Sequence, residues 1–198
     1  MTRIIGEPDG ATLLDPDEME GLKFKAIKTR GQLNQLEQIN IVEGSQWLSK
    51  KKNVDVLSDV FLKEYHKKLF GKVWSWAGKY RLTEKNIGVN PFSISVDVFN
   101  LIEDTKVWVD NSTFEPIELA AKFHHRLVKI HPFPNGNGRH ARHMANALLK
   151  TKFNLGPINW SGNLDGSSDS RTAYIKALRA ADTGDFKLLL EYVGAIKD

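Results

Sequence analysis

A short run in the second half of the chain gathers residue types that can bind phosphate and move a proton. Residues 131–142 spell His-Pro-Phe-Pro-Asn-Gly-Asn-Gly-Arg-His-Ala-Arg. Histidine is the usual general base near neutral pH, so His131 is a candidate proton acceptor. Gly136 and Gly138 flank Asn137, and glycines permit the positive φ angles and close backbone approach of an anion-binding turn. The run therefore predicts a base beside a phosphate cradle.

Two arginines add positive charge to this predicted cradle. We expect a helix from about Gly138 to Lys150, and a helix N-terminus binds anions through unpaired N–H groups and a partial positive charge. Arg139 and Arg142 are three residues apart and share a face of that helix. Two guanidinium groups on one face suit neighbouring phosphates. A helix–turn–helix corner with solvated arginines explains each residue singly, but the combination favours function.

The composition excludes several other chemistries. The chain has no cysteine, which excludes disulfides, thiolate catalysis and cysteine-ligated metals and suits a reducing cytoplasm. Neither the P-loop pattern nor the dinucleotide-binding glycine pattern is present. The histidines near the run lack the acidic or cysteine partners of a zinc site, and we expect them to pack and to form hydrogen bonds: His124, His125, His140 and His143.

Charge and hydropathy favour neither a nucleic acid nor a membrane as partner. The net charge is +4 over 198 residues, and the basic residues are scattered apart from a short cluster at Lys50, Lys51 and Lys52. Nucleic-acid binders usually concentrate basic residues on one face. No apolar run approaches the roughly 20 residues that span a bilayer, and the first residues do not resemble a secretory signal. We expect a cytoplasmic protein.

The elements that must position the run are mostly helical. Apolar residues recur at helical spacing in several segments: a short turn at 14–18, then 29–48, 56–70, 97–109, 116–130, 138–150, 169–181 and 185–196. Phe92, Ile94 and Val96 alternate with serines, which predicts a small β-hairpin at about 78–96. A loop is expected at 161–168. The sequence thus predicts an all-α domain with one hairpin at 29–198, after an N-terminal extension at 1–28.

The run closely resembles the Fic signature, His-x-Phe-x-Asp/Glu-Gly-Asn-Gly-Arg-x-x-Arg. The matching positions are His131, Phe133, Gly136, Asn137, Gly138, Arg139 and Arg142. Residues 69–81 are similar to the segment that leads into the Fic flap hairpin, and the pattern from Arg171 through Tyr174 to Leu178 is also Fic-like. The likeness covers about 29–195 and most resembles the branch called mobile mystery protein B. It implies a Fic-like helical bundle with a β-hairpin flap.

This resemblance implies a protein adenylyltransferase, which moves AMP from ATP to a Tyr, Ser or Thr hydroxyl of a target protein. His131 would take the hydroxyl proton while the oxygen attacks the α-phosphate and pyrophosphate leaves. Phe133 would anchor the loop. The nucleotide would be held by Asn135, Gly136, Asn137, Gly138, Arg139 and Arg142, the two arginines gripping the β- and γ-phosphates. The flap would pair with a target segment by strand addition.

One position departs from the signature. Asn135 stands where the family has an Asp or Glu that ligates Mg²⁺. An amide offers an oxygen without charge, so a metal at Asn135 would bind weakly and partly through the nucleotide. Two functions therefore stay open, an active transferase and a catalytically weakened module that binds nucleotide or protein. A DNA-binding helical protein is disfavoured by the scattered charge. The sequence leaves a homodimer open.

The resemblance also directs attention to an inhibitory helix. Many Fic proteins carry a Ser/Thr-x-x-x-Glu motif whose glutamate pairs with the second signature arginine, and the strict motif is missing here. Glu37, on the helix expected at about 29–48, is the nearest counterpart, and we expect it to pair with Arg142. Glu191 on the last helix is a rival. A solvated surface carboxylate is an equally weighted reading of Glu37.

Overall fold

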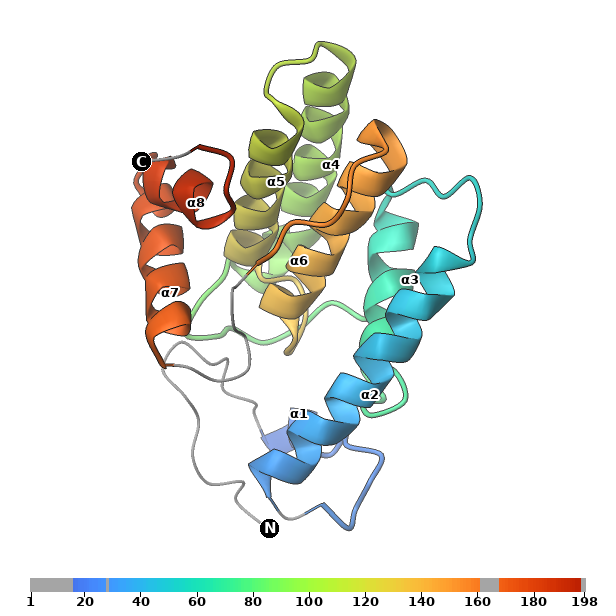
Figure 1. The fold of residues 1–198 in the computed structure, drawn as a ribbon. Helices are drawn as coiled ribbons and strands as arrows, with labels where there is room; N and C mark the ends of the chain where they lie inside the picture. The colour runs from blue at the N-terminus through green and yellow to red at the C-terminus, as the bar shows by residue number, and fades with distance from the viewer. Residues whose placement is uncertain (1–15, 28, 161–167, 197–198) are drawn as a thin grey trace.

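The computed structural model describes residues 16–27, 29–160 and 168–196 and is helical throughout (Figure 1). Its elements run in the order α1 (Pro16–Met19), α2 (Arg30–Ser49), α3 (Asp59–Phe70), η1 (Pro91–Ser93), α4 (Ile94–Asp110), α5 (Pro116–Ile130), α6 (Asn137–Leu148), η2 (Leu149–Phe153), α7 (Ser168–Asp182) and α8 (Lys187–Tyr192). The loop expected at 161–168 lies outside the described residues except for Ser168, which begins α7. The helical class is as predicted.

Helices α5 and α6 lie at the centre of the molecule and carry the residues of the run. In Figure 1, α4 lies beside α5, while α2 and α3 lie on one side of the centre and α7 and α8 on the other. One hydrophobic cluster joins α2–α6, and a second joins α5 and α6 to α7 and α8. Helices α5 and α6 are therefore packed against other helices on both sides, which fixes the connection between them.

Helix α5 has clear sequence signals at both ends. Pro116 stands at its first position, where the missing N–H costs no hydrogen bond. Leu119, Phe123 and Leu127 recur every four residues and are fully buried. The helix ends at His131, whose φ of 55° and ψ of 58° place it in the left-handed region. A left-handed residue at this point turns the chain out of the helix and into the loop.

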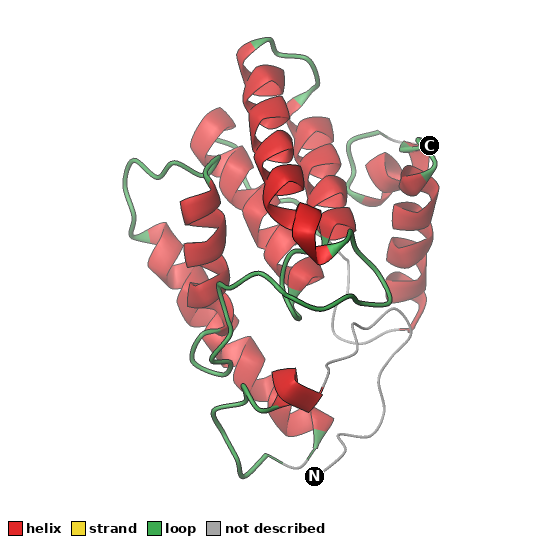
Figure 2. Ribbon diagram, turned by 180° about the vertical axis from the view of Figure 1, so that it is seen from behind, coloured by secondary structure: helices red, strands yellow, loops and turns green. Residues whose placement is uncertain are grey.

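The predicted β-hairpin is not formed. The described residues contain no strand (Figure 2), and residues 79–90 form an irregular loop, which we call the flap segment. The alternating residues assigned to a strand instead lie in η1 and the first turn of α4: Ile94 and Val98 are buried four residues apart, whereas Phe92 is 95% exposed. Asn90 accepts a hydrogen bond from the Phe92 N–H at 2.9 Å and starts the helical turn. The Asn90 cap and the four-residue spacing of apolar residues thus favour a helix over the strand that the two-residue alternation predicted.

Residues 18–23 pack against the segment that leads to the flap. Leu22 forms an isolated bridge with Trp74, and the backbone carbonyl of Glu18 accepts a hydrogen bond from the Trp76 indole at 2.9 Å. The Glu18 carboxylate also pairs with Lys85 of the flap segment. Among the described residues, no helix combines the length and apolar character needed to cross a membrane.

Candidate functional site

His131 has the geometry of a neutral base. Its side chain is buried, and Nδ1 lies 3.2 Å from the Val128 carbonyl, to which a ring N–H can donate. In that tautomer Nε2 carries the lone pair and can accept a proton. Burial, opposed by the Val128 bond and helped by the charges of Arg81 and Lys85, lowers the pKa of His131 to about 4. His131 is therefore uncharged at neutral pH.

The loop between α5 and α6 is held by side chain to main chain bonds. Asn137 accepts from the Phe133 N–H at 2.9 Å and donates to the Phe133 carbonyl at 2.8 Å. Phe133 itself is fully buried, as the resemblance implied for an anchor. The Asn137 side chain thus holds the loop closed, which leaves its backbone N–H as the group that could meet a phosphate.

His66 is a structural member of the site that the sequence did not assign. Its ring stacks on Phe133 with centroids 3.7 Å apart. Nδ1 accepts from the Gly78 N–H at 3.0 Å, so Nε2 is the donor to the Asn135 carbonyl at 3.1 Å. Burial lowers the pKa of His66 to about 3, which keeps this tautomer neutral. The ring joins the loop to the approach to the flap.

The N-terminus of α6 has the backbone shape expected of a glycine turn at a helix start. Gly136 has a φ of 78°, and a Cβ there would lie 2.7 Å from the Phe70 ring, so only glycine fits. Helix α6 starts directly afterwards at Asn137. Gly138 has open space, since the nearest atom to an added Cβ would be the Tyr174 hydroxyl oxygen at 3.8 Å. The first-turn N–H groups can therefore face a ligand across an uncrowded surface.

Glu37 pairs with the first signature arginine. Its Oε2 lies 2.7 Å from Nη1 of Arg139, and its Oε1 accepts from the Trp74 indole at 2.7 Å. The pairing predicted with Arg142 was wrong, because the carboxylate is fixed by Trp74 on the side of Arg139. The reading of Glu37 as a solvated surface carboxylate was also wrong, since only 2% of the residue is exposed. Glu191, the rival, pairs with Lys187 at 3.5 Å on α8.

Arg142, three residues further along α6, packs against Tyr174 of α7. Its guanidinium carbon is 5.3 Å from the centre of the Tyr174 ring, whose hydroxyl bonds to Nε2 of His124 at 2.9 Å. Burial lowers the pKa of Arg142. No carboxylate of the described part of the chain forms an ion pair with this side chain. A partly desolvated cation of this kind favours an anionic ligand.

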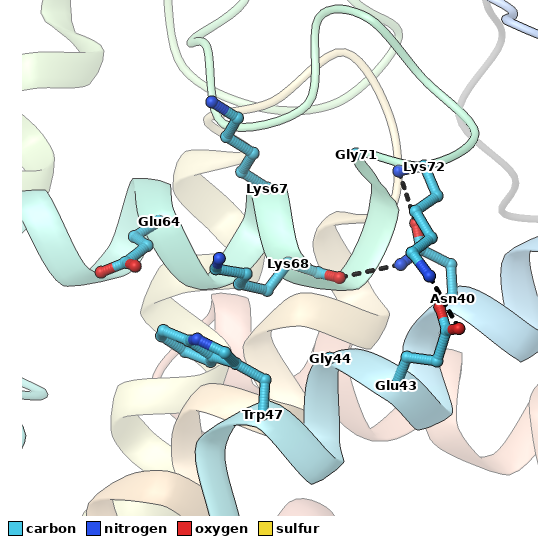
Figure 3. Close-up of a pocket in the computed structure, with 9 residues that line it drawn as sticks. All are labelled: Asn40, Glu43, Gly44, Trp47, Glu64, Lys67, Lys68, Gly71 and Lys72. Carbon is cyan, nitrogen blue, oxygen red and sulfur yellow. Dashed lines mark hydrogen bonds and ion pairs between the residues drawn. The ribbon is translucent and has the colours of Figure 1, made fainter. Parts of the chain in front are cut away.

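Helix α2, which carries Glu37, is held against α3 by hydrogen bonds along a polar groove (Figure 3). Asn40 donates to the Lys68 carbonyl at 2.9 Å and accepts from the Lys72 N–H at 2.8 Å. A Cβ on Gly44 would lie 2.8 Å from the Lys68 carbonyl, so the helices touch there. The groove encloses about 430 Å³, and Trp47 also lines it. None of the residues that line the groove belongs to 131–142, so the contribution of the groove is to fix the position of α2 along α3.

The flap segment passes directly over His131. The Arg81 N–H donates to the Pro132 carbonyl at 2.9 Å, and the Val89 N–H donates to the Ile130 carbonyl at 3.3 Å. The two ends of the segment are therefore attached on either side of the base. Between them most residues are exposed, Leu82 at 89%, whereas the Lys85 side chain is buried in its pair with Glu18.

The donor set does not fit a Mg²⁺ held by the protein. The oxygen Oδ1 of Asn135 accepts from the Gly136 N–H at 2.6 Å, which directs it to the main chain. In the described part of the chain, no group of three histidine, cysteine or acidic side chains is arranged to hold a metal. The other histidines bond to protein groups, such as His140 to the Leu62 carbonyl at 3.1 Å and His125 to Asp182 at 3.0 Å.

Comparison with known proteins agrees with this geometry. Residues 56–149 match the model of the Fic/DOC family. The "Protein adenylyltransferase fic-1" of Caenorhabditis elegans is 30% identical over 151 residues, which cover 74% of this chain and 28% of the relative. The "Protein adenylyltransferase Fic" of Nematostella vectensis is 31% identical over 66% of this chain and 30% of its own length. The chain thus spans less than a third of these curated relatives.

Solved structures show the same fold. Fic-1 from C. elegans superposes with a TM-score of 0.64 at 25% identity, over 89% of this chain and 56% of that one. The BepC protein of Bartonella tribocorum, solved with bound AMPPNP, gives 0.69 at 18% identity over 92% of this chain and 98% of that one. With the signature loop between two central helices and a matching family model, the chain belongs to the Fic/DOC family.

Proposed function

We propose that this chain is a protein adenylyltransferase that moves AMP from ATP to a Tyr, Ser or Thr hydroxyl of a target protein. The observation that carries the proposal is the neutral His131, whose ring is oriented by the Val128 carbonyl at Nδ1 and which lies one turn before the N-terminus of α6. A base next to an anion-binding turn suits attack on a phosphate. The relatives named as protein adenylyltransferases support the same reaction.

The proposed step is a single in-line displacement. The target hydroxyl oxygen forms a bond to the α-phosphorus of ATP, and the bond from that phosphorus to the bridging oxygen of pyrophosphate breaks. Nε2 of His131 accepts the hydroxyl proton. The products are the AMP ester of the target, pyrophosphate and the proton on His131, which solvent then removes. Such transfers depend mainly on positioning and charge stabilisation.

The phosphates would lie along α6. Backbone N–H groups at Gly136, Asn137 and Gly138 suit the phosphate nearest the base, and Arg139 and Arg142 suit the β- and γ-phosphates. We assign no metal-binding role to the side chain of Asn135, which faces its own main chain. Mg²⁺ is expected to arrive with ATP, coordinated chiefly by the phosphates and water.

The target would dock along the flap segment. Most of its residues are exposed and it forms no strand of its own, so an extended target segment could still bond to its backbone. Such docking would present a hydroxyl to His131 without a deep pocket. The cytoplasmic location, a homodimer and the likeness to the mobile mystery protein B branch stay predictions.

Labelled nucleotide tests the reaction type. ATP labelled at the α-phosphate should leave its label on protein in a lysate incubated with this chain, whereas ATP labelled at the γ-phosphate should not. The first result requires AMP transfer, and the second excludes a kinase. Label from the γ-position on protein would contradict the proposal.

Glu37 is proposed to inhibit this reaction by occupying Arg139. Replacing Glu37 with Gln keeps an oxygen for the Trp74 indole but removes the charge that pairs with Arg139. We expect label transfer to rise by roughly tenfold, since a partly buried ion pair that competes with phosphate contributes about 1–2 kcal/mol. Glu191→Gln is the matched control. Equal rates for Glu37→Gln and the unmodified chain would contradict the inhibitory role.

A weakened binding module is the second candidate, and Asn135 favours it. The family acid is absent, and the amide oxygen is already bonded to Gly136. If lost metal binding limits turnover, Asn135→Asp should raise label transfer and make it steeply dependent on Mg²⁺, while ATP binding measured without metal changes little. Label transfer by Asn135→Asp that is no faster than transfer by the unmodified chain would contradict this second candidate.

A further inference from the structure

Arg81 is a buried arginine whose donors go to main-chain carbonyls on both sides of the site. Only 2% of the residue is exposed. Nε donates to the His131 carbonyl at 2.7 Å and Nη1 to the Thr83 carbonyl at 2.8 Å, while Nη2 donates to the Val89 carbonyl. A longer contact of 3.5 Å joins Nη2 to the Ile130 carbonyl. One side chain thus holds the catalytic backbone and both ends of the flap segment.

The chemistry of these contacts suits arginine alone. A guanidinium presents five N–H donors in a fixed fork, whereas a lysine ammonium is a single point of charge. The last carbonyls of α5 lack partners within the helix and carry partial negative charge, which a cation stabilises. His131 also adopts a left-handed conformation, which is unfavourable for a non-glycine residue, so external contacts must hold it there.

The flap segment is in direct contact with this arrangement. A Cβ added to Gly88 would lie 2.7 Å from Nη2 of Arg81 and 2.7 Å from Cβ of His131. The flap backbone therefore touches the base and the guanidinium together. If the flap moves, either the backbone of His131 moves with it or the Arg81 hydrogen bonds break.

We propose that Arg81 is a positioning residue that couples the flap segment to His131, so that a target seated on the flap sets the placement of the base. Its role in the reaction rests on the adenylyltransferase function proposed above. The coupling itself is a property of the chain without nucleotide. It can therefore be measured even if the proposed function fails.

The ionisable groups that face His131 make the coupling observable. Arg81 and Lys85 both come from the flap segment, and Lys85 pairs with Glu18. Burial is the main reason that the pKa of His131 lies at about 4, the two cations act in the same direction, and the flap backbone at Gly88 lies against the His131 side chain. Loosening the flap admits water to the ring, so the pKa of His131 should rise toward its ordinary value.

The first experiment is an NMR titration of the histidine rings without ATP. The signal of His131 is identified by its loss in His131→Gln. Arg81→Lys keeps the charge but loses the fork, and it should raise the pKa of His131 by about one unit. Arg126→Lys is the matched control, since Arg126 forms a surface pair with Asp104 at 2.7 Å. An unchanged pKa of His131 in Arg81→Lys would overturn the coupling.

The second experiment measures label transfer by the same proteins. Arg81→Lys should lower kcat by about 100-fold while the KM for ATP stays within about twofold, because the base is misplaced and the phosphate contacts are intact. Millimolar guanidinium should partly restore transfer by Arg81→Ala but not by His131→Ala. A fall in kcat without any change in the pKa of His131, or a loss confined to ATP binding, would overturn the proposal.

Gly88→Ala provides the same test from the flap side if Arg81→Lys does not fold. Its added methyl group would press on both Arg81 and His131. As in Arg81→Lys, the pKa of His131 should rise and kcat should fall. A Gly88→Ala protein with the pKa and kcat of the unmodified chain would show that the flap and the base are independent.

Discussion

Two irregular segments meet at the site and differ sharply in how they are held. All of the residues 131–137 are buried, whereas Arg81 is the single buried residue of the flap segment 79–90. The loop 131–137 is fixed by internal bonds from Asn137 and by the stacked ring of His66. The flap is attached near its ends and through the Lys85–Glu18 pair, and most of its other residues are exposed. Under the proposed function, a nucleotide site that is already shaped would thus lie beside a surface that can adapt to a target.

This difference explains how one domain could combine fixed chemistry with variable targets. Phosphoryl transfer needs donors and base in place without rearrangement at the moment of reaction. Recognition by backbone pairing needs an edge that is not already satisfied. The two requirements conflict within one segment. Under the proposed function, the loop 131–137 would meet the first and the flap segment the second, with Arg81 joining them.

Low pH should destabilise the folded chain through its buried histidines. Burial lowers the pKa of His66 to about 3 and those of His131 and His143 to about 4. The unfolded chain, with ordinary histidine pKa values near 6.5, binds more protons below that pH, so stability should fall as pH drops from about 6.5 toward 4.

Urea unfolding at several pH values measures this effect. The midpoint should fall steadily between pH 7 and pH 5. His143→Gln removes one depressed histidine and should flatten the slope. A midpoint that does not change over this range would show that the histidines are not held neutral by burial.

Gly136 offers a local break of the cradle. An alanine there would adopt an unfavourable positive φ and press against Phe70, at a cost of about 1–3 kcal/mol or more. Gly138→Ala is the matched control, because its Cβ meets only the Tyr174 hydroxyl oxygen at 3.8 Å. Thermal unfolding should show a lower midpoint for Gly136→Ala alone. Equal midpoints for the two variants would contradict the account of this turn.

The flap should tolerate change that the cradle does not. Leu82 is 89% exposed, so Leu82→Ser should alter the free energy of unfolding by less than about 0.5 kcal/mol. ATP binding should also stay unchanged, whereas transfer to a target should weaken if the flap is the docking surface. Calorimetry and label transfer on one preparation separate these effects. Weaker ATP binding by Leu82→Ser would show that the flap is part of the cradle.

The sequence predicted the helical class well because long apolar periodicities are strong signals, as in α5, where Leu119, Phe123 and Leu127 recur. It failed at the flap, where a short alternation of Phe92, Ile94 and Val96 could not be told from the start of a helix. It placed the right residue types in the loop, but not their partners. The pairing of Glu37 with Arg139, and the roles of His66 and Arg81, depend on contacts between residues distant in sequence.

His131 provides the most direct test of the central claim. We predict that His131→Ala, incubated with α-labelled ATP and lysate, loses label transfer by about 10²-fold or more while binding ATP as the unmodified chain does. Its thermal midpoint, measured alongside, controls for folding. Label transfer by His131→Ala at the rate of the unmodified chain would contradict the assignment of His131 as the base.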